Sequence, residues 1–414
     1  MTLQQTERQL PEAASARPTS VYVHFPWCLA KCPYCDFVSY VTPAIDHEGY
    51  ADAVLRELET RAPLGQGRRV ESVFFGGGTP SLWDPRALGR VLAAIGRTFE
   101  TAEDLEVTVE CNPTSLDEDR ARALGDVGVN RLSIGVQSLS DERLRFLGRL
   151  HDAAGAVAAV RGAMRAGMPR ISSDLIFGLP EQSSDQAREE ATTLADLGLG
   201  HLSCYQLTIE SGTRFGELAR RGRLPLADEG QVAETFLAID EALESRGLLH
   251  YEISNYARKG QEARHNLGYW RGHEYVGIGC GAYGFVRCEP RAAPSDPPLA
   301  GVRWRNRVTP ERYVEATRAA HPRPHGAPDG IADTTEALSP DTLLRERIML
   351  GLRVTEGVDL ERSARELGTE GWTASRERAS AWLVARGRLV RDGARAIIPK
   401  SAWLWADDSA ARLF

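Results

Sequence analysis

Three cysteines lie close together near the start of the chain, at Cys28, Cys32 and Cys35, in the spacing C-x3-C-x2-C. Thiolates are the usual protein ligands of iron–sulfur clusters, and three of them on one loop can each ligate one iron of a [4Fe–4S] cubane. The fourth iron then has no protein ligand and is open to a small chelating molecule. The spacing therefore predicts a [4Fe–4S] cluster with one accessible iron.

A structural zinc ion and three ordinary buried thiols are the alternatives to a cluster. Zinc needs a fourth cysteine or histidine, and the neighbouring His24 is expected on the preceding strand, badly placed to close a tetrahedron. Burial as small apolar groups is typical of isolated cysteines, whereas these three share a loop flanked by Pro26 and Pro33. The cluster is the favoured interpretation.

Glycines and polar residues follow several short apolar segments further along the chain. Residues 76–80, Gly-Gly-Gly-Thr-Pro, come directly after the segment 70–75, and consecutive glycines let backbone groups approach a ligand closely, with a tight turn as the alternative. Carboxylate, amide and guanidinium groups after other segments can hydrogen-bond an amine, ribose hydroxyls and a carboxylate. Each alone could equally be a solvated or capping residue. These residues are Glu110, Gln137, Arg149 and Asp174.

Short apolar segments alternate with amphipathic stretches over residues 19–210, which predicts the strands and helices of a parallel α/β sheet. Six such units with right-handed crossovers make an incomplete barrel. Ligands of parallel α/β proteins bind at the carboxyl ends of the strands, so the polar residues are expected to share one site. The predicted strands are 20–24, 70–75, 105–110, 131–136, 171–177 and 202–208, and the predicted helices are 49–61, 85–99, 117–128, 152–166 and 184–198.

The composition changes after the barrel. Residues 1–18 are expected to be a disordered tail, residues 19–285 the barrel domain, and residues 286–334, with their Pro- and Gly-rich stretches, a loop or linker. Helices are predicted at about 338–350, 359–367 and 371–386, followed by a hairpin around Asp392-Gly393, a favourable turn dipeptide. Residues 335–414 are therefore expected to form a smaller winged-helix-like domain.

Charge and hydropathy exclude some classes of function. A net charge of −7 argues against a protein that coats nucleic acid, although the wing contains a locally basic stretch from Arg376 to Arg395. No apolar run is long enough to span a membrane, and no secretory signal is recognisable. Seven cysteines, an odd number, fit a reducing cytoplasm and a metal site better than disulfides. Cys111 and Cys204 are expected to be small core residues.

The cysteine spacing and the Gly-Gly-Gly-Thr-Pro run together resemble the radical S-adenosylmethionine superfamily. The resemblance implies that the open iron binds S-adenosylmethionine and that the barrel is the partial (β/α)6 barrel of that superfamily. The order and spacing of later residues resemble the oxygen-independent coproporphyrinogen III oxidase group. The cofactor-binding positions implied by this resemblance are Tyr22, Tyr34, Gly77, Gly78, Thr79, Glu110, Gln137, Arg149 and Asp174.

Two departures point to a sister family of that group, the HemW-type heme chaperones. The oxidases have a fourth cysteine where this chain has Phe37, and a longer N-terminal extension. The stretch His265-Asn266-Leu-Gly-Tyr269-Trp270 matches a motif associated with heme binding in the chaperones. An imidazole can ligate heme iron and the aromatic rings can contact a porphyrin; a core histidine with packed rings is the alternative. Further candidate ligands are Cys280, Cys288, His250 and His273.

The resemblance thus implies a cytoplasmic protein that binds heme and passes it to acceptor proteins, through which it could associate with membranes. No nucleic-acid partner is expected. An enzyme that decarboxylates porphyrinogen propionates by radical chemistry is the alternative function. The glycine-rich stretch 277–284 is expected to pack closely against the barrel mouth.

Overall fold

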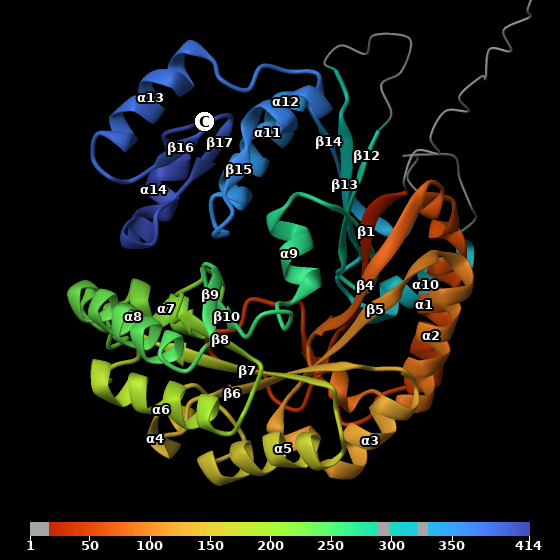
Figure 1. The fold of residues 1–414 in the computed structure, drawn as a ribbon. Coiled ribbons are helices and arrows are strands. Elements are labelled where there is room, and N and C mark those ends of the chain that lie inside the picture. The colour runs from red at the N-terminus through yellow and green to blue at the C-terminus, as the bar shows by residue number, and fades with distance from the viewer. Residues whose placement is uncertain (1–15, 289–297, 321–329) are drawn as a thin grey trace, which may run out of the picture.

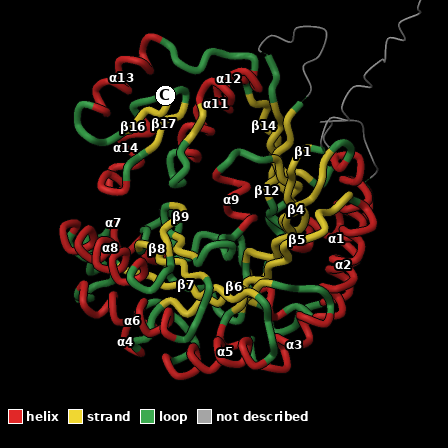
Figure 2. Tube along the Cα trace, in the orientation of Figure 1, coloured by secondary structure: helices red, strands yellow, loops and turns green. Residues whose placement is uncertain are grey.

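The computed structural model describes residues 16–288, 298–320 and 330–414, and its main feature is one large sheet wrapped by helices (Figures 1 and 2). Seven neighbouring strands run parallel, and six of them are those expected from the sequence. The seventh, β11, lies beside β1 on the side away from β4. In sheet order the parallel strands are β11 (Glu274–Gly279), β1 (Arg17–Phe25), β4 (Arg68–Gly77), β5 (Glu100–Cys111), β6 (Arg131–Gln137), β7 (Arg170–Phe177) and β8 (His201–Gln206).

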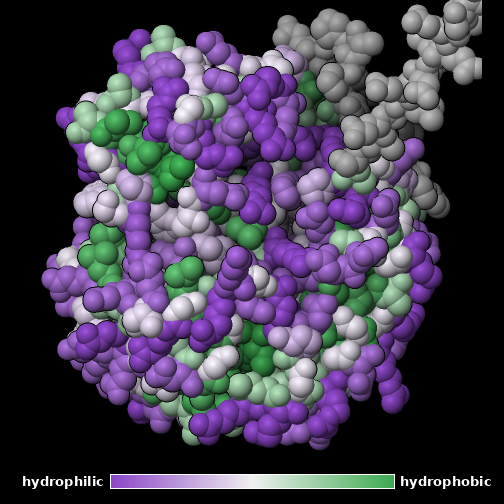
Figure 3. All heavy atoms as spheres, in the orientation of Figure 1, coloured by the Kyte–Doolittle hydropathy of each residue, from purple (hydrophilic) through white to green (hydrophobic). Residues whose placement is uncertain are grey.

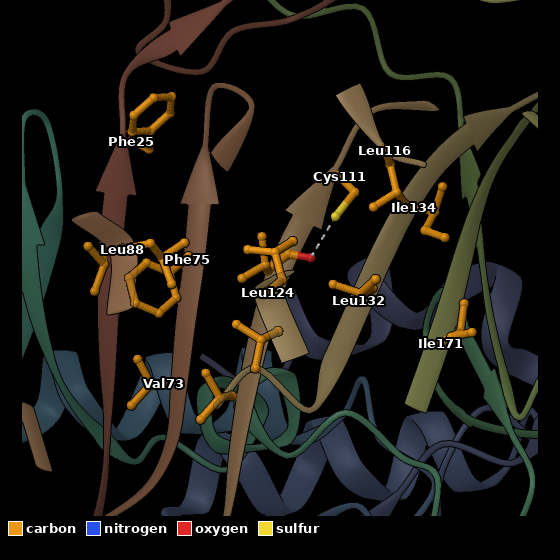
Figure 4. Packing of buried hydrophobic residues seen from close by; sticks show 14 of the residues in the cluster. Phe25, Val73, Phe75, Leu88, Cys111, Leu116, Leu124, Leu132, Ile134 and Ile171 are labelled. Carbon is orange, nitrogen blue, oxygen red and sulfur yellow. Dashed lines mark hydrogen bonds between the residues drawn. The ribbon is translucent and has the colours of Figure 1, made fainter. Parts of the chain in front are cut away.

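The strands alternate between an apolar outer face and a polar inner face. In β1, Val21 and Val23 are fully buried in the core cluster, while Tyr22 between them is partly accessible. The core lies between the sheet and its covering helices, and Figure 4 shows part of it, including Val73 and Leu132. Because side chains alternate across a strand, the opposite face is free to carry polar groups into the barrel.

The helices predicted between the strands are all present and begin at side-chain caps. An Asp or Ser at each N-cap accepts a backbone hydrogen bond from the first turn, which satisfies donors that the helix cannot. The cap residues are Asp46, Asp84, Asp117, Asp152 and Ser183. The helices that follow these caps are α1 (His47–Arg61), α2 (Pro85–Thr98), α3 (Glu118–Asp126), α5 (Ala153–Arg165) and α6 (Ser184–Asp196). The same part of the chain also contains shorter elements: α4 (Asp141–Phe146), β2 (Trp27–Cys28), β3 (Tyr40–Val41) and the 3-10 turns Ala62–Gly65, Pro80–Leu82 and Pro113–Ser115.

The expected linker at 286–334 is wrong where the structure describes it. This part of the chain continues the sheet antiparallel through β12 (Tyr283–Arg287), β13 (Gly301–Asn306) and β14 (Ala332–Leu338), with α10 (Pro310–Ala319) packed on α1. Residues 289–297 and 321–329 of the expected linker, and 1–15 of the expected tail, lie outside the described residues. The strand β1 begins at Arg17, one residue before the predicted end of the tail.

A buried carboxylate on α1 explains this departure. Glu57 accepts hydrogen bonds from Asn306 Nδ2 at 2.7 Å, Tyr313 Oη at 2.7 Å and the Gly279 backbone at 2.8 Å. Burying a carboxylate is costly unless donors surround it, so these partners fix β11, β13 and α10 onto α1. The partners lie more than two hundred residues away in the sequence, where composition alone carries no sign of them.

The other edge of the sheet continues through β10 (Asn255–Ala257) and β9 (Leu249–Glu252), after helices α7 (Arg214–Arg220) and α8 (Glu229–Glu244). The short helix α9 (Arg264–Trp270) follows and lies between the sheet and the C-terminal domain, where it contacts β1, β4 and α11 (Figure 1). The stretch 277–284 is closely packed: a Cβ on Gly277 would lie 1.7 Å from the carbonyl oxygen of Tyr283 in the same stretch, and a Cβ on Gly279 would lie 2.4 Å from the carbonyl oxygen of His24 on β1.

The C-terminal part forms the smaller helical domain that the sequence predicts. Its helices α11 (Pro340–Gly351), α12 (Leu360–Leu367) and α13 (Ala374–Val384) precede a hairpin of β16 (Val390–Asp392) and β17 (Arg395–Ile397), and the hairpin turn contains Gly393 at φ +59°. The strand β15 (Val358–Asp359), the turn Lys400–Trp405 and α14 (Ala406–Ala411) complete it. Over the residues that the structure describes, no helix is long and apolar enough to cross a membrane.

Candidate cluster and cofactor site

The three cysteines lie on the loop between β1 and α1, and each is half-buried. Thr79 Oγ1 lies 3.4 Å from Cys28 Sγ, and Arg149 Nη1 lies 3.5 Å from Cys32 Sγ. Both groups are hydrogen-bond donors, which favour a thiolate sulfur over a thiol. Burial acts in the opposite direction and raises the pKa of Cys28 and Cys35. The loop therefore presents three soft sulfur ligands with donors aimed at two of them.

The structure argues against a single zinc ion at this loop. His24 uses both ring nitrogens, with Nε2 2.8 Å from the Val38 carbonyl oxygen and Nδ1 3.0 Å from Tyr22 Oη. It is therefore not available as a fourth ligand. No three His, Cys, Asp or Glu side chains converge on a single-ion site anywhere in the described ranges. A cluster, whose ligands bind separate irons, suits the three sulfurs better.

The glycine run after β4 locks the cysteine loop in place. A Cβ on Gly77, which has φ +110°, would lie 2.4 Å from the His24 ring, and a Cβ on Gly78 would lie 2.5 Å from the Trp27 carbonyl oxygen. The Thr79 N–H donates to that same carbonyl at 2.8 Å. Only glycine permits so close an approach of two backbones, so this run positions the loop that carries Cys28.

Two carboxylates face the barrel interior at the carboxyl ends of the strands. Glu110, at the end of β5, accepts a hydrogen bond from the Gly77 N–H at 3.0 Å, and Asp174, in β7, accepts one from Ser133 Oγ at 3.2 Å. Burial raises the pKa of Glu110 to about 8 and that of Asp174 to about 6. Poorly solvated carboxylates that are still partly accessible are suited to receive a cationic ligand.

Gln137 and Arg149 complete this inner surface. Gln137 ends β6 with φ +67°, a left-handed conformation that is unfavourable for any residue other than glycine and is often found at functional sites. Arg149 Nη2 donates to the Gly135 carbonyl at 2.9 Å, while its Nε is buried and has no hydrogen-bond partner within the described residues. An unpaired buried donor beside the cysteine loop is the kind of group that a carboxylate ligand satisfies.

The two tyrosines of the predicted set occupy different places. Tyr22 lies on the inner face of β1, with its ring stacked on Phe74 at a centroid distance of 6.2 Å. Tyr34 lies on the cysteine loop and packs against Phe215. Tyr22, Gly77 and Glu110 are brought together, and Arg149 is brought to the cysteine loop. That these residues contact a cofactor stays a prediction.

Sequence reasoning missed Ser133 and Phe74, which support these residues from the inner face. Ser133 lies 3.2 Å from both oxygens of Asp174, and Phe74 stacks on both Tyr22 and His265, which also contact each other. The signal that could have found them is alternation, because every second residue of these strands faces the interior.

The predicted heme motif forms α9, and its histidine is enclosed. His265 is 1% exposed, with Nδ1 2.9 Å from Ser72 Oγ and Nε2 3.1 Å from Tyr269 Oη. Its ring stacks on Phe74 at 4.8 Å, and burial lowers its pKa to about 3. In this conformation His265 is a neutral core histidine with both nitrogens engaged, so ligating iron would require it to give up a hydrogen bond.

The remaining candidate ligands differ in accessibility. Cys280 is buried, and its thiol donates to the Val308 carbonyl at 2.9 Å. His250 is buried against Tyr256 and pairs with Asp240. His273 is partly accessible, and Cys288 is half-buried. Cys111 and Cys204 are confirmed as core residues.

Comparison with known proteins agrees with the fold. Residues 22–194 match the family model described as Radical SAM superfamily, and residues 338–405 match the HemN C-terminal domain. Coproporphyrinogen III oxidase (HemN) from Escherichia coli has a similar structure, with a TM-score of 0.77 over 96% of this chain and 90% of that one. At 21% identity this likeness concerns the fold. The fold and the site define a radical S-adenosylmethionine protein with a HemN-type C-terminal domain.

Curated relatives narrow the class further. The Heme chaperone HemW of Mycobacterium tuberculosis (strain H37Rv) is 34% identical over 98% of both chains. The protein of the same name in Escherichia coli (strain K12) is 42% identical over 270 residues, which cover 65% of this chain and 70% of that one. The chain belongs to the heme chaperone HemW family.

Proposed function

We propose that this protein is a cytoplasmic heme chaperone that carries a [4Fe–4S] cluster and S-adenosylmethionine and transfers heme to acceptor proteins, some of them at membranes. The observation that carries the proposal is the convergence of the cysteine loop, the glycine run and the Glu110–Asp174 pair at one end of the barrel. The relatives named as heme chaperones, one of them aligned over nearly the whole chain, support the heme part of the proposal.

The residues of the site have separate roles in this proposal. Cys28, Cys32 and Cys35 hold the cluster, whose open iron binds S-adenosylmethionine and supplies one-electron chemistry. Glu110 and Asp174 face the positive charge of that ligand, and Arg149 offers its unpaired Nε–H to the carboxylate. Tyr22, Tyr34, Gly77, Gly78, Thr79 and Gln137 are the remaining proposed cofactor-binding residues.

Heme is the cargo, and the α9 segment is proposed to be part of its binding region. His265, Asn266, Tyr269 and Trp270 are the residues proposed from the family motif. The contacts of His265 with Ser72 and Tyr269 mean that it either supports this region from within or ligates iron only after it is released.

Among the described residues, Phe37 and the arginines of the wing bear on the two alternative functions, the oxidase and the nucleic-acid binder. Phe37, at the position of the oxidases' fourth cysteine, is 58% exposed and offers no ligand. Three arginines of the wing already have partners: Arg376 is buried against the Leu413 carbonyl, Arg391 pairs with Glu377, and Arg388 pairs with Asp408. A nucleic acid would have to break these contacts to be bound.

Anaerobic reconstitution followed by heme titration tests the proposal. The wild type is expected to gain the broad absorption of a [4Fe–4S] cluster and to bind one heme, and Cys28→Ser, Cys32→Ser and Cys35→Ser are each expected to lose the cluster. Heme loaded on the wild type should move to an apo heme protein when the two are mixed. A cluster without heme uptake, combined with turnover of coproporphyrinogen, would favour the oxidase instead.

A further inference from the structure

A groove that is partly open to solvent lies where the C-terminal end of α9, the start of β1 and the end of β12 meet the C-terminal domain. We call it the arginine groove and define it by Trp270, His273, Arg287, Arg347, Arg362 and Arg395. Its lining includes none of the three cysteines of the cluster loop and neither Glu110 nor Asp174, so it is separate from the site described above.

Positive charge dominates this groove. Six arginines line it against three carboxylates, Glu356, Asp359 and Glu366, although the whole chain carries a net charge of −7. Arg287, Arg347 and Arg362 all pair with Glu366, at 3.2, 3.0 and 3.1 Å. One carboxylate cannot neutralise three guanidinium groups, so the groove attracts anions, and guanidinium groups bind carboxylates particularly well.

Buried hydrogen-bonding capacity is also left over at this place. Arg287 Nε is buried without a hydrogen-bond partner in the described part of the chain, and Glu274 Oε2 is 3.9 Å away. Buried donors are almost always paired in folded proteins. Arg287 Nε has an ion-pair partner in Glu274 but no hydrogen bond within the described residues, so this N–H is available to an anionic ligand in the groove.

His273 gives the groove a metal-binding group. The structure gives its ring nitrogens no hydrogen bond to any described residue, in contrast to His24 and His265. Burial, and the nearby Arg271, Arg287 and Arg347, lower its pKa to about 4. The imidazole is therefore neutral at physiological pH, which is the form that ligates metals.

The same wall offers flat and apolar surface. Trp270, three residues before His273, is partly accessible and lines the groove, whereas Val354 and Val358 of the lining are buried beneath it. The groove therefore offers three kinds of group to one ligand. The indole suits an apolar ring, the neutral imidazole suits an iron at its centre, and the arginines suit carboxylates at its edge.

We infer that the arginine groove is the cargo site, where an anionic metalloporphyrin binds with its carboxylates on the arginines, its ring against Trp270 and its iron on His273. This inference rests on the proposed function, since it assumes that the cargo is heme. His265 then acts as a positioning residue that anchors α9 to β4 through Ser72, and it does not contact the iron.

Parallel titrations of the full-length protein with hemin and with iron-free protoporphyrin IX test this inference, because the second probe has the carboxylates but no iron. His273→Ala and His273→Gln are expected to weaken hemin binding at least tenfold and to change its Soret band, while binding of the iron-free porphyrin stays within twofold of wild type. The double variant Arg362→Gln/Arg395→Gln is expected to weaken both probes about tenfold. Arg365→Gln, on the same helix as Arg362 but outside the groove and paired with Glu361, is the matched control.

The outcomes separate the inference from the proposed function. One outcome contradicts the groove as the heme site but not the proposed heme-chaperone function. In that outcome, His273→Ala and the double arginine variant bind hemin as the wild type does, while a folded His265→Ala no longer binds it. If the wild type binds neither hemin nor the iron-free porphyrin, both the groove inference and the proposed heme-chaperone function are wrong. Circular dichroism and the melting temperature of every variant show that a loss of binding is not a loss of folding.

Discussion

The backbone N–H of Gly77 donates a 3.0 Å hydrogen bond to Glu110 Oε2. This bond joins the glycine run after β4 to the carboxylate at the end of β5. Because a Cβ on Gly77 would collide with the ring of His24, the same residue also contacts the strand that leads into the cysteine loop. One residue thus connects the ligands of the cluster to the proposed binding site of the cofactor.

Binding of S-adenosylmethionine should release protons near pH 7. The pKa of Glu110 is raised to about 8 by burial, so its carboxyl is mostly protonated at pH 7 before a cationic ligand arrives. A positive charge beside it favours the ionised form and lowers the pKa. Calorimetry of the reconstituted protein in two buffers of different ionisation enthalpy should show this release, and Glu110→Gln should lack most of it. Equal proton release in the variant would show that another group is responsible.

Glu110 should also make the protein without S-adenosylmethionine less stable as the pH rises. Its folded pKa, about 8, lies above that of an ordinary glutamate, about 4.3, so the folded state holds a proton that the unfolded state has lost. The stability linked to this proton is fully present below about pH 4 and is lost as the pH rises through 8. The melting temperature of Glu110→Gln should therefore exceed that of wild type by more at pH 8.5 than at pH 5.5. A difference that does not depend on pH would contradict this.

Gly77→Ala should prevent cluster assembly. The new Cβ would lie 2.4 Å from the His24 ring, at a backbone φ of +110° that alanine rarely adopts. We expect a loss of stability of about 2 kcal/mol or more and a several-fold fall in iron content after reconstitution. Gly96→Ala is the control, because that glycine is exposed on α2 and its Cβ meets nothing within 4 Å. It should stabilise the helix by about 0.5–1 kcal/mol and leave the iron content unchanged.

His265→Ala should destabilise the protein by about 3 kcal/mol, because it creates a cavity and leaves Ser72 and Tyr269 without their partner. The pKa of His265 is about 3, below the value of about 6.5 for an unfolded histidine. The stability that it contributes is present above pH 6.5 and is lost as the pH falls toward 3. Urea unfolding at pH 7.5 and pH 5 should show a smaller difference between variant and wild type at pH 5. An equal stability difference between variant and wild type at the two pH values would indicate that His265 is not buried in its neutral form.

The part of the site that lies close together in the sequence could be predicted from the sequence. Cys28, Cys32 and Cys35 fall within eight residues, so their spacing alone limits which metals they can hold. The alternation of strands and helices also predicted the six parallel strands that carry Glu110 and Asp174, because one period of the pattern corresponds to one βα unit.

Only the tertiary structure decided where distant residues meet. The partners of Glu57 lie at Gly279, Asn306 and Tyr313, and they turned an expected linker into an edge of the sheet. The enclosure of His265 depends on Ser72, nearly two hundred residues before it. The arginine groove combines residues from Arg17 to Arg395. Burial, hydrogen bonding and charge density depend on distances in space, and composition and local periodicity describe only distances along the chain.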